Sequence, residues 1–225
     1  MKKSSKIKLI IMSHPDDAEL SCGGSIAKWT QTEVVYYIIV SCGEKGSWDK
    51  EESIFDIGKK REKEAMDAAK CLNVKKVIFL RHNDGEVAEA KTLKLELAAL
   101  IRYLKPISII THDPWSRQFH PDHRGTALAV FEAIMIARDW HFYPFLKEIG
   151  LSPHRPVDLL LTPTDNPTFV NDISGTIDKK IEAIRIHNSQ LTIHPGWEER
   201  IRDWARREGK ESEFEYGEGF YRMQL

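Results

Sequence analysis

The chain has 225 residues, of which 41 % are hydrophobic and 30 % charged, a composition typical of a globular protein rather than a disordered chain. Lys and Arg number 33 and Asp and Glu 34, so the formal net charge is -1 and no basic surface for nucleic acid is expected. Cys22, Cys42 and Cys71 are too few for a disulfide framework or a cysteine-rich zinc site, and we expect a reducing, cytoplasmic compartment.

The apolar run at residues 7–12 follows a basic start and is too short for a secretory signal or a membrane span. It is better interpreted as a first buried strand. The sequence therefore predicts neither a membrane segment nor a membrane partner.

Strand patterns alternate with helix patterns along the chain. Short runs rich in Ile and Val, typical of strands buried on both faces, cover residues 8–13, 34–41, 76–80, 107–111 and 157–162. Helix patterns cover residues 18–31, 59–73, 91–104, 122–137 and 174–187. The alternation predicts an α/β, Rossmann-like fold, a mostly parallel sheet with helices on both faces, in a single domain over residues 1–225.

Two local features lead to further expectations. In the helix at 122–137, Leu128, Phe131 and Met135 recur at helical spacing as its apolar stripe, and Ser174 is a candidate N-cap for the helix at 174–187. The segment 197–225 is highly charged, so we expect an appended, exposed helix and tail held by ion pairs. A partner-binding surface is the alternative for this segment.

Polar residues follow every predicted strand. These clusters are His14 to Asp17, Gly43 to Gly46, His82 to Gly85, His112 with His120 to His123, and Asp165 with Asn166. Because the carboxyl ends of parallel strands meet at one edge of a sheet, we expect an active site at that edge.

The triplet His-Pro-Asp occurs twice, at residues 14–16 and at residues 120–122, where His123 follows. A single copy is also typical of a helix start, since Pro and acidic residues favour the first turn. Two copies, each between a strand and a helix, favour metal ligation from two loops with an open coordination position. Asp16 and Asp17 also occupy the place of the Gly-rich turn of a dinucleotide fold, which argues against direct nucleotide binding.

At these residues the sequence resembles the PIG-L/LmbE-like family of zinc-dependent N-acetylglucosamine deacetylases. The first family motif is matched by His14-Pro15-Asp16-Asp17-Ala18-Glu19 with Gly23-Gly24, and the second by His120-Pro121-Asp122-His123. Weaker similarities lie at Glu44, Arg61, Asp84 and His187-x-Ser189-Gln190. Together they span residues 7 to about 190, which leaves the charged C-terminal segment outside the resemblance.

The resemblance implies a zinc site formed by His14, Asp17 and His123, with a metal-bound water as the nucleophile and Asp16 as general base. Fe²⁺ or another divalent metal is an alternative to Zn²⁺. His120 would stabilise the oxyanion or act as an acid, and Asp122 or another carboxylate would keep its imidazole charged.

The implied activity is removal of an acetyl group from a small acetylated amino-sugar conjugate. The candidate substrate contacts are Arg61, Glu44 and Asp84. Trp48, Trp115 and Phe119, in the surrounding loops, are candidates for stacking on a sugar ring, and packing at the rim of the site is the alternative. The resemblance also suggests a homo-oligomer.

Three other functions remain as alternatives. Two His and one Asp also form the metal site of non-haem Fe(II) oxygenases. A metal phosphoesterase is the second alternative, although the loops lack a second carboxylate-rich metal site. The third is a non-catalytic binding or assembly module, which the full set of His14, Asp16, Asp17, His120 and His123 argues against.

Overall fold

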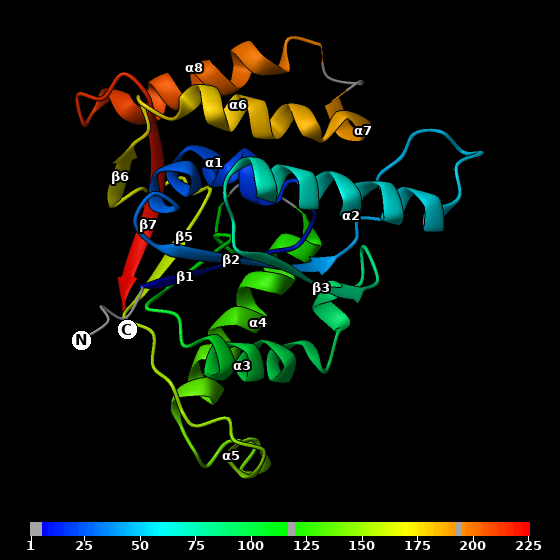
Figure 1. Ribbon diagram of the computed structural model, residues 1–225, viewed down its shortest axis with the longest axis vertical. Coiled ribbons are helices and arrows are strands. Elements are labelled where there is room, and N and C mark those ends of the chain that lie inside the picture. Colours follow the sequence, from blue (N-terminus) through cyan, green and yellow to red (C-terminus); the bar gives the residue numbers. More distant parts are fainter. Residues whose placement is uncertain (1–5, 117–119, 192–194) are drawn as a thin grey trace.

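The computed structural model describes residues 6–116, 120–191 and 195–225. Within these residues the chain forms one seven-stranded sheet in the order β3-β2-β1-β4-β5-β7-β6 (Figure 1). Its strands are β1 (Ile7–Met12), β2 (Val34–Ser41), β3 (Lys76–His82), β4 (Ser108–Thr111), β5 (Asp158–Leu161), β6 (Phe169–Asp172) and β7 (Gly217–Gln224). Strands β1 to β5 are parallel, whereas β7 is antiparallel to both β5 and β6.

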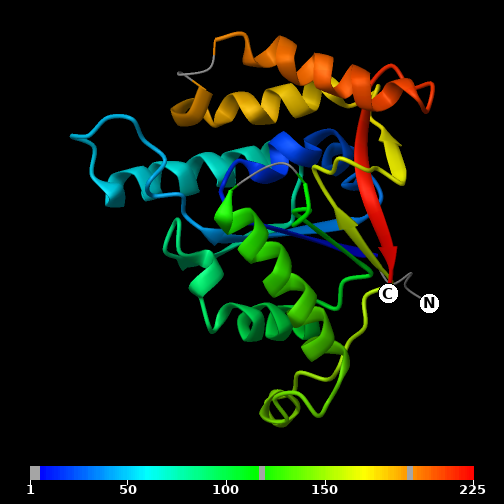
Figure 2. The same ribbon diagram turned by 180° about the vertical axis from the view of Figure 1, so that it is seen from behind.

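Helices cover both faces of the sheet (Figures 1 and 2). One face carries α1 (Asp17–Trp29), α2 (Ile54–Cys71) and α6 (Ile177–Ile186), and the other carries α3 (Leu93–Leu104) and α4 (Pro121–Arg138). Helix α8 (Trp197–Lys210) packs outside α6 and against β7, and the short elements are η1 (Val87–Glu89), α5 (Phe145–Glu148) and α7 (Asn188–Leu191). The predicted α/β fold with a mostly parallel sheet is confirmed.

Strand β1 shows why the central strands are continuously apolar. Leu9 and Ile11 belong to the core between the sheet and helices α3 and α4. Ile10 and Met12 belong to the core on the opposite face, under α1. Since side chains alternate between the two faces of a strand, a strand covered on both faces needs apolar residues at every position.

Helix α4 buries a different face from the one expected. Leu128 and Met135 are each 43 % exposed, whereas Ala127, Val130 and Ala133 are fully buried. The small side chains allow α4 to lie close to its neighbours, and a Cβ at Gly125 would fall 2.8 Å from the Ala88 backbone of η1. The expected stripe is therefore wrong for Leu128 and Met135, whereas Phe131 is half-buried against the core.

The C-terminal segment is a structural part of the sheet rather than an appended tail. Residues 217–224 form β7, in which Phe220 is fully buried. Glu218 is also buried, and it accepts hydrogen bonds from the backbone of Gly24 and Ser25 and from Lys180 Nζ. Helix α8 does carry the expected ion pairs, including Arg202 with Asp178, but the expectation of an exposed tail is wrong.

A smaller correction concerns the start of α6. The N-cap is Thr176 rather than Ser174. The Ser174 hydroxyl instead donates to Asp172, the last residue of β6.

Arg102 of α3 provides a test of the packing around the end of α4. Its buried guanidinium donates to the carbonyl oxygens of Ile136 and Ala137, in the last turn of α4, and to that of Asp139. Carbonyls in a last helical turn lack helical partners. We expect Arg102→Met to lower the free energy of unfolding by about 3 kcal/mol, since several buried carbonyls lose their donor. Urea unfolding measures this free energy, and Arg138→Met, at an exposed position of the same helix end, is the control. Equal stabilities of the two variants would contradict a stabilising role of Arg102.

Candidate metal centre

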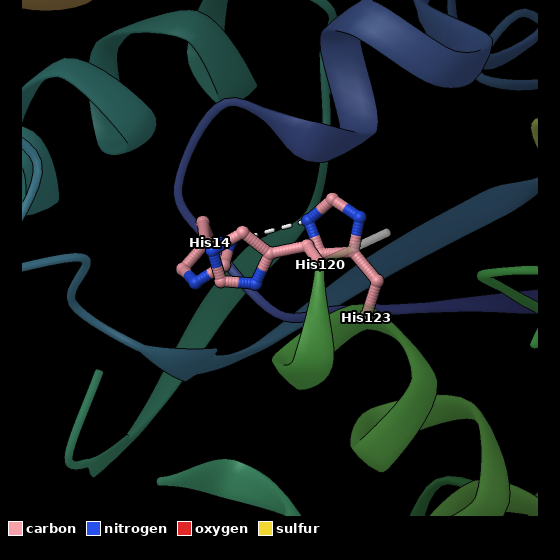
Figure 3. Close-up of side chains that lie close together, drawn as sticks. All are labelled: His14, His120 and His123. Atoms are coloured by element: carbon pink, nitrogen blue, oxygen red, sulfur yellow. Dashed lines mark hydrogen bonds between the residues drawn. The ribbon is translucent and has the colours of Figure 1, made fainter. Parts of the chain in front are cut away.

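The site lies at the carboxyl edge of β1 and β4, where the chain turns to opposite sides of the sheet. His14 follows β1 directly, and Asp17 begins α1. His120 is the N-cap of α4, with Pro121 in the first helical position and His123 in the first turn. Figure 3 shows the imidazoles of His14, His120 and His123 close together, although they come from two distant segments. The strand order thus brings the two His-Pro-Asp motifs together.

His14, Asp17 and His123 form a compact set of ligand atoms. His14 Nδ1 lies 3.3 Å from His123 Nε2 and 3.4 Å from Asp17 Oδ2. His123 Nε2 lies 3.2 Å from Asp17 Oδ1. A tetrahedral zinc ion with bonds of about 2.0–2.1 Å separates its ligand atoms by about 3.4 Å. Each pair is thus spaced like two ligands of one ion, although the two distances to Asp17 end on different oxygens, and zinc binding by this set stays a prediction.

The other nitrogen of His14 faces two carboxylates. Nε2 lies 3.1 Å from Asp84 Oδ1 and 3.3 Å from Asp122 Oδ2. The Asp122 carboxylate is itself held by the backbone N–H groups of Gly85 and Val87. The proton of a neutral His14 therefore belongs on Nε2, which leaves the Nδ1 lone pair for a metal, and such carboxylate partners are usual for metal-binding histidines.

The charges around His14 attract a cation. Burial alone would lower the pKa of His14, but hydrogen bonds with Asp122, Asp17 and Asp84 raise it well above 6.5. Burial likewise opposes ionisation of Asp17, yet His123 and His112 hold the pKa of its carboxyl well below 3.8. A positive charge is therefore favoured among these side chains, whether carried by a proton or by a metal ion.

His112 joins the cluster from the end of β4. Its ring stacks on that of His123 with centroids 4.0 Å apart, and its Nε2 lies 3.3 Å from Asp17 Oδ2. Burial lowers the pKa of His112 to about 4, so it is neutral. Besides the predicted set, the described residues offer other groups of ligand atoms that lie within reach of one ion, among them Asp17, His112 and His123, and His14, His120 and His123. Since His112 Nε2 already accepts the Ser13 backbone N–H, the predicted set is better than the one with His112.

Asp16 points to a different partner from Asp17. Its Oδ1 accepts a hydrogen bond of 2.7 Å from Arg61 Nη2. The buried Arg61 also donates to the Gly43 carbonyl. A Cβ at Gly43 or Gly46 would overlap Arg61 Nη1, which explains the two glycines of this loop. Arg61, predicted as a substrate contact, thus holds the Asp16 carboxylate in place, and a contact with substrate stays a prediction.

His120 and Asp122 differ from the expectation. The Asp122 carboxylate contacts His14 and not His120, and His120 Nδ1 accepts the Asp122 backbone N–H. Burial, followed by the nearby His14 and His123, lowers the pKa of His120 below 6.5. The Asp122 carboxylate is therefore not a direct partner of the His120 ring, and a cationic His120 in the reaction stays a prediction. A neutral His120 carries its proton on Nε2 and remains a hydrogen-bond donor.

Glu44 and Asp84, the other predicted substrate contacts, are engaged within the protein. Glu44 accepts from the Asp84 backbone N–H and from Ser41 Oγ. Besides His14, Asp84 binds the Lys45 backbone N–H. Asp84 lines the cavity beside the metal centre, whereas Glu44 lines a neighbouring one. Their roles toward a substrate stay predictions.

A cavity of about 440 Å³ opens beside the ligand atoms. Its walls include Asp16, His120, Asp84, Arg61 and Gln190. Among the candidate stacking residues, Trp115 packs on Phe131 with ring centroids 5.6 Å apart, which favours the rim interpretation for it. Phe119 lies outside the described residues. Trp48 is 85 % exposed and lines a second, adjoining cavity.

The family model described as "PIG-L: GlcNAc-PI de-N-acetylase" matches residues 9–134. A diacetylchitobiose deacetylase of Thermococcus kodakarensis is 32 % identical over 94 % of this chain and 80 % of its own length. A Bacillus cereus protein named "Probable N-acetyl-alpha-D-glucosaminyl L-malate deacetylase 2" is 28 % identical over 81 % of this chain and 82 % of its own.

A solved structure shows the same similarity. The N,N'-diacetylchitobiose deacetylase from Pyrococcus horikoshii superposes with a TM-score of 0.93 and 31 % identity, over 98 % of this chain and 85 % of that one. The chain belongs to the PIG-L family, and the relatives named above are all deacetylases of N-acetylglucosamine-type sugars. They give no support to the oxygenase alternative. Among the described residues, no helix has the length and apolar character needed to span a membrane.

Proposed function

We propose that this protein is a divalent-metal-dependent hydrolase that removes the N-acetyl group from an N-acetylglucosamine-type sugar. The observation that carries the proposal is that His14 Nδ1, the Asp17 carboxylate and His123 Nε2 lie within 3.4 Å of one another. The carboxylate of Asp16, which precedes Asp17, is paired with Arg61 instead. Family membership supports the reaction class, since the named relatives are deacetylases.

Zinc is the metal that we propose. Two imidazole nitrogens and one carboxylate suit several divalent metals, but the ligand spacing matches a tetrahedral site, which zinc prefers. A zinc ion there would supply Lewis-acid chemistry, by acidifying a water molecule and polarising the amide carbonyl.

Residues around the metal centre have the other roles in the reaction. Asp16 accepts the proton of the attacking water, because its carboxylate lines the cavity and is held at Oδ1 by Arg61. His120 donates a hydrogen bond from Nε2–H to the oxygen of the developing tetrahedral centre. Asp84 and Asp122 keep His14 in the tautomer that presents Nδ1.

The proposal extends to compartment and assembly. The three cysteines are free, which supports a reducing, cytoplasmic compartment. A homo-oligomer is proposed from the resemblance alone.

Removal of the metal tests the function directly. We expect the chelated protein to release no acetate from N,N'-diacetylchitobiose and the zinc-reconstituted protein to recover this activity. The measurement is acetate release together with the metal content of the same sample. Full activity in a metal-free sample, or iron-dependent oxygen consumption without acetate release, would contradict the proposal.

A further inference from the structure

The first turn of α1 is separated from the rest of the helix. It covers residues 17–21, and the backbone leaves helical geometry at Cys22, where φ is -146° and ψ is 28°. Beyond this break α1 is anchored by Glu218 of β7. Asp16, the N-cap, makes no capping hydrogen bond with its side chain. Because a single helical turn is unstable by itself, the turn that carries Asp17 depends on contacts with other elements.

Glu19 links this turn to the end of α6. Its side chain is fully buried, and its Oε2 lies 3.2 Å from Nε2 of His187, the buried residue that ends α6. Glu19 Oε1 and the nearby hydroxyl of Tyr37 have no hydrogen-bond partner within the described part of the chain. Burial alone would lower the pKa of His187, but the hydrogen bond with Glu19 and the charges of Glu19 and Asp16 raise it above 6.5. The buried Glu19 carboxylate therefore depends on His187 as its donor.

The segment 187–190 also binds α2 and the loop after β2. The Ser189 backbone N–H and Oγ both donate to the carboxylate of Glu64 on α2, at 2.9 and 2.6 Å. Gln190 Nε2 donates to the carbonyl oxygen of Gly46 in the loop. Helices α6 and α7 accordingly lie along α1 and α2 (Figure 1). One short segment thus fixes three elements relative to one another.

These three elements are the ones that position the proposed general base. Asp16 directly precedes the first turn of α1, and its carboxylate is held by Arg61 of α2. Arg61 also donates to the carbonyl oxygen of Gly43, in the loop after β2. The direction of the Asp16 carboxylate relative to Asp17 therefore depends on how α1, α2 and this loop are held together.

We propose that His187 is a positioning residue of the metal centre: its Nε2 donates to Glu19 and so fixes the turn from which Asp16 and Asp17 project. His187 is not among the residues that line the cavity beside the metal centre, so it acts through Glu19. This role accounts for the His187-x-Ser189-Gln190 pattern, which the proposed function leaves without one. The inference rests on the proposed deacetylase function for the reaction that it affects.

Two substitutions of His187 separate the hydrogen bond from the filling of space. Leu fills much of the space of the ring but cannot donate, whereas Gln can place an amide N–H near the position of Nε2. We expect His187→Leu to lower kcat for acetate release from N,N'-diacetylchitobiose by about tenfold or more, because a displaced base loses its alignment with the reacting atoms. KM should change by less than about threefold, since the lost interaction acts on the reaction and not on binding. His187→Gln should recover most of kcat.

The metal itself gives a readout that is independent of turnover. With Co²⁺ in place of zinc, the visible absorption spectrum reports the geometry of the ligands. We expect His187→Leu to change this spectrum and to weaken metal binding, and His187→Gln to preserve both. The matched control is Asn171→Ala, which removes a buried hydrogen bond of 2.9 Å between β6 and Ser25, in the part of α1 beyond the break. The control should lower stability but leave kcat and the spectrum unchanged.

A double variant covers the case in which His187→Leu does not fold because Glu19 is left buried without a partner. Glu19→Met combined with His187→Leu leaves no unpaired carboxylate, so it should fold and show the same losses. If these variants change the Co²⁺ spectrum while the wild-type protein releases no acetate, the positioning role stands and the proposed function is wrong. If the wild-type protein releases acetate and these variants match Asn171→Ala in kcat and spectrum, the function stands and the positioning role is wrong. An equal loss of kcat in His187→Gln and His187→Leu would also overturn the role of the hydrogen bond.

Discussion

Asn in place of Asp16 is expected to lower kcat for deacetylation by about 10²–10⁴, the usual contribution of a general base. The amide oxygen of Asn can still accept the hydrogen bond from Arg61 Nη2, so the loop should keep its geometry while the proton acceptor is lost. Zinc should remain bound, because His14, Asp17 and His123 are unchanged. Steady-state kinetics and metal analysis of the same preparation measure both effects.

The matched control for this variant is Asp67→Asn, which removes an exposed carboxylate on α2 and should leave both kcat and metal content unchanged. A near-normal kcat in the Asp16→Asn protein would contradict the assignment of the base. Loss of zinc from that protein would show instead that Asp16 is a ligand.

His123→Ala is expected to abolish stable zinc binding and, with it, deacetylation. Loss of an outer hydrogen-bond partner lowers metal affinity by roughly 10–100-fold, and loss of a direct ligand should lower it further. Asp84→Asn alters the carboxylate facing His14 Nε2, so we expect this variant to lose zinc affinity by roughly 10–100-fold only. Competition with a chromophoric chelator measures both affinities.

The control for the ligand series is His141→Ala, since the side chain of His141 is 82 % exposed and lies outside the cluster. If His123→Ala binds zinc as tightly as the wild type does, His123 is not a ligand. A larger loss in Asp84→Asn than in His123→Ala would assign the metal to His14, Asp84 and Asp122, a set that also lies close together.

The central fold could be predicted because its strands are covered on both faces. That environment selects unbroken runs such as Leu9 to Met12, which stand out in the sequence. Strand β7 could not be predicted in the same way, since it contains two glycines and three charged or amide residues in eight positions. Its pairing depends on β5 and β6 on either side, which is tertiary information.

The buried face of α4 illustrates a similar limit. Leu128 and Met135 are the larger side chains, and a periodicity argument assigns them to the core. The buried residues of α4 are instead Ala127, Val130 and Ala133 with others beside them, and at Gly125 the Ala88 backbone leaves no room for a Cβ. Which side of the helix faces its neighbours depends on this tertiary packing, which the sequence does not state.

The site was predictable as a set of residues but not as a set of contacts. The two His-Pro-Asp motifs indicate His14 and His123 as candidate metal ligands, and the parallel-strand topology explains why their loops meet. The pairing of Asp16 with Arg61 and of Asp122 with His14 joins residues 45 and 108 positions apart, and no local pattern specifies such partners. His112 was detectable only from its place directly after β4.

Crystals of the zinc-loaded protein, measured at the zinc absorption edge, would test the metal centre most directly. The predicted result is one anomalous peak bonded to His14 Nδ1, Asp17 and His123 Nε2 at about 2.0–2.2 Å, with the Asp16 carboxylate still on Arg61. A peak elsewhere, or one that includes Asp16 among its ligands, would contradict the account.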